Sequence, residues 1–128
     1  MATEVSGHWQ RAIEVPRTAA LNAGGNAQAN SVSCGSRGNC SAGGFYTDHR
    51  NRRQAFVVRE ISGHWLKAIE VPGTAVLNTG GNAQVTWVSC ASAGNCAAGG
   101  SYQNGSGPQA FVVSQVNGHW RKAKPLVF

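Results

Sequence analysis

The sequence predicts an all-β fold built from two repeated four-stranded units. Charged residues make up only 12% of the chain, and 17 of its 128 residues are glycine. Such a composition favours strands and tight turns over helices. Residues 6–46 align without a gap on residues 62–102, and residues 54–65 match 109–120 after a one-residue deletion. A period near 55 residues is typical of stacked supersecondary units.

The repeats divide the chain without indicating more than one domain. We expect a single domain over residues 1–128, since one domain of ordinary size suits this length. Unit one covers residues 6–61, unit two covers 62–116, and a partial third unit covers 117–128.

Each unit is expected to contain four strands. The segment at 63–71 lies between a Ser-Gly turn and a Pro-Gly turn. The following stretch, 74–84, carries a Gly-Gly-Asn turn sequence and is predicted to be a loop. Apolar and β-branched runs then predict strands at 84–90, 95–102 and 109–116.

Small residues in the expected strand at 95–102 indicate close packing between units. The run Ala97–Ala98–Gly99–Gly100 brings little side-chain bulk, so a neighbouring sheet can approach closely. Four-stranded units at this kind of spacing are typical of β-propeller blades. The fold class is therefore all-β, with two four-stranded propeller-like blade repeats plus one extra strand.

Two blades cannot close a ring, because propellers use about four to eight. The sequence therefore predicts a propeller completed by homo-oligomerisation, with a trimer slightly favoured over a tetramer. Head-to-tail contacts close into a ring when the rotation suits. The alternative is a compact monomer in which the two units pack face to face.

The segment SCASAGNCAAGGSY, followed by QAFVV and NGHW, carries a family resemblance. It resembles the blade repeats of secreted actinobacterial β-propeller proteins, and distantly the Asp-box hairpins of sialidase-type propellers. The resemblance covers residues 6–124. The chain departs from the Asp-box pattern because no Asp occupies the turn and Cys96 follows it. The resemblance thus implies a fold and leaves sialidase activity unsupported.

The positive charge is uneven. The net charge is +6, and arginines cluster in the stretch HRNRRQ, whose counterpart NGSGPQ has none. A nucleic-acid binder would place basic residues on one face, interleaved with aromatics. The sequence therefore predicts no nucleic-acid partner. It favours a solvated loop at Arg50, Arg52 and Arg53, with a modest polyanion contact as the alternative.

The cysteines form two copies of one hairpin. Cys34 and Cys40, like Cys90 and Cys96, are separated by five residues across a tight link. Antiparallel neighbours across a short turn suit disulfide geometry, so we expect one bridge within each unit. Reduced cysteines and a zinc site are the alternatives. Two bridges predict a secreted or extracellular protein, although no signal peptide is visible. No apolar run is long enough to span a membrane.

No catalytic constellation is visible in the sequence. It contains no Walker loop, HExxH or GxSxG motif. Asp48 and His49 are adjacent but have no nucleophile in a matching context. We therefore expect a protein that is not an enzyme and has no cofactor and no metal site. His64 and Trp65, like their counterparts at 8–9 and 119–120, are expected to be structural.

The remaining hypotheses are two kinds of binding module. The first is lectin-like recognition of a glycan or glycosylated surface, made multivalent by ring assembly. Aromatic rings stack on sugars and amides bond to hydroxyls, and the candidates are Trp87, Tyr46, Tyr102, Asn26 and Asn82. The alternative is a protein-interaction module that docks on or restrains a secreted hydrolase through the Arg-rich loop.

Overall fold

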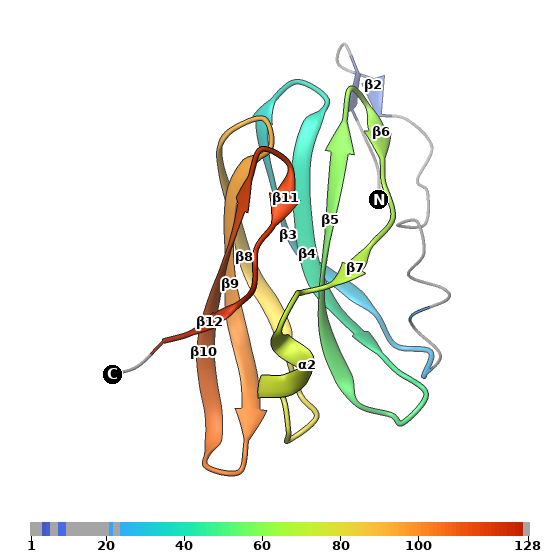
Figure 1. Cartoon of the computed structure of the whole chain (residues 1–128). Coiled ribbons are helices and arrows are strands. Elements are labelled where there is room, and N and C mark those ends of the chain that lie inside the picture. The colour runs from blue at the N-terminus through green and yellow to red at the C-terminus, as the bar shows by residue number, and fades with distance from the viewer. Residues whose placement is uncertain (1–3, 6–7, 10–20, 22–23, 127–128) are drawn as a thin grey trace.

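A computed structural model describes residues 4–5, 8–9, 21 and 24–126 of the chain. Figure 1 shows the described strands gathered into two sheets that lie side by side, and a short hairpin of β1 (Glu4–Val5) and β2 (His8–Trp9). The all-β prediction is confirmed.

Sheet one is formed by the first repeat. Its long strands are joined by tight hairpins in the order β3-β4-β5, and β6 and β7 both pair with β5. All the pairings are antiparallel. The strands are β3 (Gln28–Ser36), β4 (Asn39–Thr47), β5 (Arg53–Ile61), β6 (His64–Trp65) and β7 (Ile69–Glu70).

Sheet two repeats this arrangement with the second unit. The order is β8-β9-β10-β11, and β12 also pairs with β10. The strands are β8 (Gln84–Ser92), β9 (Asn95–Asn104), β10 (Gly107–Val116), β11 (His119–Trp120) and β12 (Lys124–Pro125). Both hairpins that carry the cysteines have the same register, with Cys34 opposite Cys40 and Cys90 opposite Cys96.

Two details of the predicted elements are wrong. The segment 63–71 is not one strand, since it forms two separate short strands, β6 and β7, that both pair with β5. The predicted loop at 74–84 contains a short helix, α2 (Thr74–Leu77), which lies between β5 and β9. Thr74 is buried and its hydroxyl donates a 2.7 Å hydrogen bond to the Val71 carbonyl, which anchors this turn against the core.

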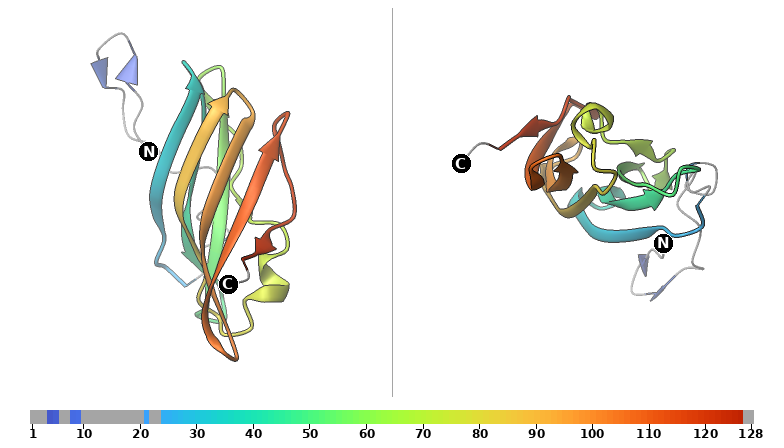
Figure 2. Two further views of the ribbon diagram at one scale, coloured as in Figure 1. Left: turned by 90° about the vertical axis from the view of Figure 1, so that its left-hand side faces the viewer. Right: turned by 90° about the horizontal axis from the view of Figure 1, so that it is seen from below.

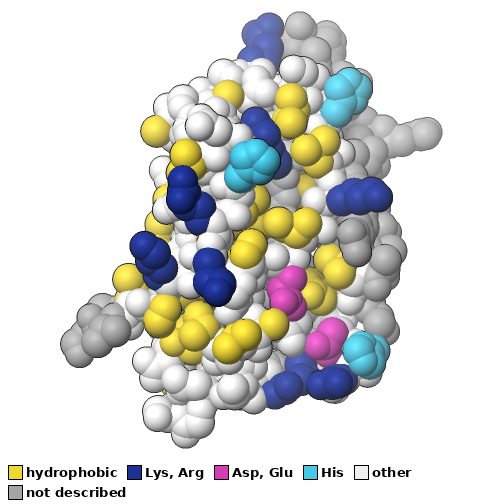
Figure 3. All heavy atoms as spheres, viewed as in Figure 1, with side chains coloured by type: hydrophobic (Ala, Val, Ile, Leu, Met, Phe, Trp, Pro, Cys, Tyr) yellow, Lys and Arg dark blue, Asp and Glu magenta, His cyan; other side chains and the backbone are white. Residues whose placement is uncertain are grey.

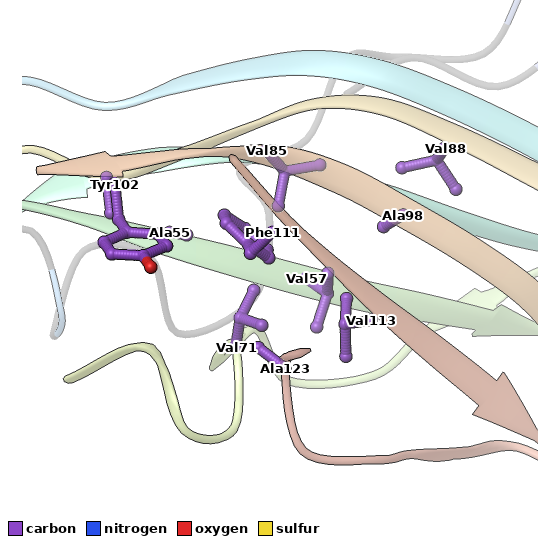
Figure 4. Close-up of a cluster of buried hydrophobic side chains, with 11 residues drawn as sticks. Ala55, Val57, Val71, Val85, Val88, Ala98, Tyr102, Phe111, Val113 and Ala123 are labelled. Carbon is purple, nitrogen blue, oxygen red and sulfur yellow. The ribbon is translucent and has the colours of Figure 1, made fainter. Parts of the chain in front are cut away.

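The main core lies between the two sheets. Sheet one contributes Ala55 and Val57 from β5, and sheet two contributes larger side chains such as Phe111 and Tyr102. Figure 4 shows these side chains converging from both sheets, with Val71 and Ala123 closing one side. Burying this many apolar side chains, at about 25 cal/mol per Å², makes the contact between the units a principal source of stability.

A second cluster lies on the other side of sheet one. It contains Ala42, Tyr46, Phe56, Val58 and Ala68, with Leu21 and Trp65 packed against it. Residues on alternate positions of β5 therefore point into two different cores, as the period of a strand requires. The repeat counterparts Ala98, Tyr102, Phe111 and Val113 all face sheet one. The side of unit two that is buried thus corresponds to the side of unit one that carries the second cluster, whereas sheet one is buried on both sides.

Candidate functional site

The side of sheet two that faces away from sheet one is the candidate binding surface, and we call it the terminal face. In β9 and β10 the residues that pack in the core alternate with those that point outward. The register of β8 with β9 extends the same side across the sheet. The terminal face consists of Trp87, Ser89 and Ala91 on β8, Ala97, Gly99 and Ser101 on β9, and Ala110, Val112 and Ser114 on β10. The left view of Figure 2 looks toward these strands.

Trp87 is the largest side chain on the terminal face. It is 43% exposed, and it lies opposite Gly99 in the β8–β9 pairing. A Cβ atom at Gly99 would stand 2.4 Å from three atoms of the indole. Gly99 is therefore the residue that lets the ring rest directly on the backbone of β9.

Uncharged polar groups flank this indole. The Thr86 hydroxyl donates a 3.3 Å hydrogen bond to the Gly99 carbonyl. Ser89 and Ser101 share the face with Trp87, and the nine residues of the terminal face carry no charge. Lys124 of β12 lies at the far edge, opposite Val112. The part of the face around Trp87 is an aromatic ring bordered by hydroxyl groups.

The two tyrosine candidates are buried. Tyr46 is 4% exposed, and its hydroxyl donates a 3.0 Å hydrogen bond to Glu70 Oε2. Burial, together with the nearby Glu70 carboxylate, raises the pKa of Tyr46 well above its usual value. Tyr102 is 5% exposed and packs against Phe111, with ring centroids 6.4 Å apart. Neither ring is accessible for stacking on a sugar in this structure.

The two asparagine candidates lie in the exposed segments before β3 and β8. The Asn26 carbonyl accepts a 2.7 Å hydrogen bond from the Thr47 hydroxyl. The Asn82 N–H donates a 2.9 Å hydrogen bond to the side chain of Asn78. Asn82 and Trp87 are five positions apart along the chain, which is about 16 Å in an extended strand. The structure thus does not gather the five candidates into one site.

The Arg-rich loop is only partly the solvated segment that the sequence favours. The Arg52 guanidinium donates a hydrogen bond to the Thr79 carbonyl in the segment that leads to β8. The Arg53 guanidinium lies 4.2 Å from the centre of the Phe45 ring. Two of the three arginines therefore contact protein groups, while Arg50 is exposed.

Asp48 holds this loop in shape. Its Oδ1 accepts hydrogen bonds from the backbone N–H groups of Arg50 and Arg52, at 2.9 and 3.0 Å. Its Oδ2 accepts one from the Gln54 amide, at 3.0 Å. Burial by itself would raise the pKa of Asp48, but these hydrogen bonds outweigh it and lower the pKa. The carboxylate organises a turn and has few lone pairs left for catalysis.

Sequence reasoning missed Asn78, which is buried beside this loop. Its Nδ2 donates to the Arg53 carbonyl at 3.0 Å, and its Oδ1 accepts from the backbone of Asn82 and Gln103. Asn78 therefore joins β5, the segment before β8, and β9. The available signal was the Asn that precedes the Gly-Gly turn in both repeats, at 22 and 78.

The predicted disulfides are confirmed. Cys34 is bonded to Cys40 and Cys90 to Cys96, each within its own hairpin. His64 and His119 are exposed, whereas Trp65 and Trp120 pack against the two cores. Within the described ranges, no group of three or more His, Cys, Asp or Glu side chains is arranged to hold a metal ion.

Comparison with known proteins adds no family. No protein-family model matches the chain, and no curated protein matches it. Among the described residues, no helix has the length and apolar character needed to cross a membrane.

Proposed function

We propose that this protein is a non-catalytic module that binds a neutral carbohydrate on the terminal face, with Trp87 as the stacking platform. The single observation that carries the proposal is the half-exposed indole resting on Gly99. A large aromatic side chain on an exposed strand face is otherwise unfavourable, since burying it would remove considerable apolar area from water.

The surroundings of Trp87 suit a sugar better than a charged ligand. Sugars present an apolar C–H face that stacks on an aromatic ring and hydroxyls that need hydrogen-bond partners. Ser89 and Ser101 supply hydroxyl groups of their own, and the nine residues of β8, β9 and β10 that form the terminal face are uncharged, with Lys124 of β12 at its far edge. An anionic polymer would instead favour a cluster of Lys and Arg.

The Arg-rich loop supports the protein-docking alternative less well. Arg52 already contacts Thr79, and Arg53 already lies on Phe45. A partner would have to compete with these contacts or rely on Arg50. Figure 3 shows that basic side chains are scattered over the visible face and not gathered into one patch.

We also propose that the two sheets are related as neighbouring propeller-type blades and that the protein acts outside the cell. The first proposal is supported by the packing of one side of unit two on the opposite side of unit one, with β3 and β8 in close contact. The second is supported by the two disulfides, which persist in oxidising compartments.

A dense array of neutral glycans, followed by titration of the best binder, tests the carbohydrate proposal. A single shallow site of about twelve sugar atoms gives roughly millimolar affinity. We expect the Trp87 indole N–H resonance to shift on titration, and Trp87→Ala to lose binding at least tenfold. Val76→Ala is the matched control, because Val76 is 81% exposed on α2. An array blank for neutral glycans, or Trp87→Ala binding like the wild type, would overturn the proposal.

A further inference from the structure

Side chains of β3 satisfy the backbone of β8 across the contact between the two units. The Ser31 Oγ accepts a 3.1 Å hydrogen bond from the Val88 N–H, and the Ser33 Oγ accepts a 3.0 Å bond from the Cys90 N–H. The Asn30 amide donates a 2.8 Å bond to the Val85 carbonyl. An edge strand that would otherwise present unpaired groups is therefore covered by the preceding unit.

Glycines on the same face of sheet one permit this close approach. A Cβ at Gly35 would stand 2.2 Å from the backbone carbon of Ser92, so no side chain fits there. A Cβ at Gly43 would stand 2.6 Å from a methyl group of Val85. The Val85 side chain thus enters a space that exists only because Gly43 lacks one.

Polar contacts on this face are equally specific. The Ser41 hydroxyl donates a 3.0 Å hydrogen bond to Gln115 in the buried contact between the sheets. The Arg59 guanidinium lies against Gly118, where a Cβ would collide with it. Together with β3, these residues form the face by which unit one receives unit two.

The terminal face of unit two occupies the equivalent position in the repeat, but it has lost most of these features. Ser33 and Gly43 keep their identity, as Ser89 and Gly99. The residues that make the other contacts all differ, and the pairs are Asn30 and Thr86, Ser31 and Trp87, Gly35 and Ala91, Ser41 and Ala97, and Arg59 and Ser114.

Two of these replacements actively obstruct stacking. Ala91 carries the Cβ for which Gly35 has no room. Trp87 covers Gly99, the position that in unit one receives Val85. A further unit arriving in the same geometry would meet one backbone collision and one filled space.

We infer that unit two is a terminal unit, whose outer face does not accept another unit, whether from this chain or from a second copy, in the way that unit one accepts unit two. The ring of three copies that the sequence favours requires that same contact between chains, so the inference opposes it. Stacking of units in this geometry instead ends at the terminal face. This inference does not depend on the carbohydrate proposal.

The mass of the wild-type chain in solution is the first test. Light scattering after size exclusion should give a single subunit of 13.4 kDa at every concentration over a hundredfold range. A stable trimer or tetramer would overturn the inference.

A matched pair of variants tests the mechanism. Gly35→Ala places the unit-two residue in unit one, and Ala91→Gly does the reverse. Gly35→Ala should lower the urea midpoint and speed hydrogen exchange at the Val88 and Cys90 amides at least tenfold. Ala91→Gly should leave exchange at these amides within twofold of the wild type. Equal urea midpoints and equal amide exchange rates in the two variants would contradict the inference. So would a Ser31→Trp variant whose Val88 and Cys90 amides exchange at the wild-type rate.

Discussion

Ser41 on β4 donates a 3.0 Å hydrogen bond to Gln115 on β10, and both side chains are buried between the two sheets. The repeat counterpart of Gln115 is Glu60, which is equally buried at 2% exposure. Glu60 Oε2 has no hydrogen-bond partner within the part of the chain that the structure describes. The same position thus holds an amide in unit two whose oxygen is paired and whose Nε2 has no described partner, and a carboxyl group in unit one whose Oε2 has none.

Glu60→Gln is expected to stabilise the protein at neutral pH. A buried carboxylate with an unpaired oxygen is costly, and replacing it by a neutral amide should raise the free energy of unfolding by about 1 kcal/mol. Urea denaturation at pH 7 measures the change. Gln115→Glu is the mirror-image variant and should destabilise, because it places a charge in the contact between the sheets. Destabilisation by Glu60→Gln would show that the carboxylate has a favourable role in the fold.

The same substitution should flatten the pH dependence of stability. Burial raises the pKa of Glu60 above its ordinary value of 4.5, and the nearby His64 only partly opposes this. The folded protein therefore holds this proton more tightly than the unfolded chain does. The contribution of Glu60 is most favourable below pH 4.5 and declines as the pH rises through its folded pKa. In Glu60→Gln this decline should be missing, and an unchanged profile would contradict the assignment.

Asp48→Ala tests a carboxyl group whose pKa is lowered, in contrast to the raised pKa of Glu60. The variant removes three hydrogen bonds that shape the loop between β4 and β5, and it should lose about 2 kcal/mol of stability at pH 7. Because the pKa of Asp48 is lowered, its contribution is present above its ordinary value of 3.8 and is lost as the pH falls through the lowered pKa. The difference between variant and wild type should therefore shrink at acid pH. A difference that stays constant from pH 7 to pH 2 would rule out the charge as its source.

The long strands were predictable because their causes are local. Two residues link β3 to β4 and β8 to β9, and the paired cysteines mark both hairpins. Helix α2 was not predictable, since four residues show no helical period and its anchor, the bond from Thr74 to Val71, depends on the core between the sheets. The break between β6 and β7 likewise depends on how both strands meet β5.

The candidate site was predictable only at Trp87. Tyr46 and Tyr102 were proposed as aromatic side chains able to stack on a sugar. Both also recur at the same position in the two units, and a residue that serves the core recurs in this way too. The Arg-rich loop was interpreted as solvated because only one unit has it. The two units are not equivalent, however: in the described part of the chain unit one packs against the sheet of unit two, and Arg52 contacts the segment that leads into that sheet. Differences between repeats therefore mark contacts between them.

Arg52→Ala and Arg50→Ala form a matched pair that tests this interpretation. Arg52 bonds to the Thr79 carbonyl, so its removal should lower the free energy of unfolding by about 0.5–1 kcal/mol, as for a partly exposed charged hydrogen bond. Arg50 is exposed, and its removal should change stability by less than about 0.5 kcal/mol. Thermal and urea unfolding of both variants measure the difference. Equal losses of stability in the two variants would support the interpretation that the whole loop is solvated.

Removing the disulfides should reveal that the two hairpins are not energetically equivalent. Closing a loop of this size stabilises by about 2 kcal/mol in the chain-entropy description, so Cys34→Ala/Cys40→Ala should lose roughly that amount. Cys90 also packs against the core between the sheets, whereas Cys34 is exposed. Cys90→Ala/Cys96→Ala should therefore lose about 1 kcal/mol more, because apolar contact is lost with the bridge. Urea unfolding of the two double variants gives both values. A larger loss from the Cys34–Cys40 pair would mean that the contact between the units does not depend on Cys90.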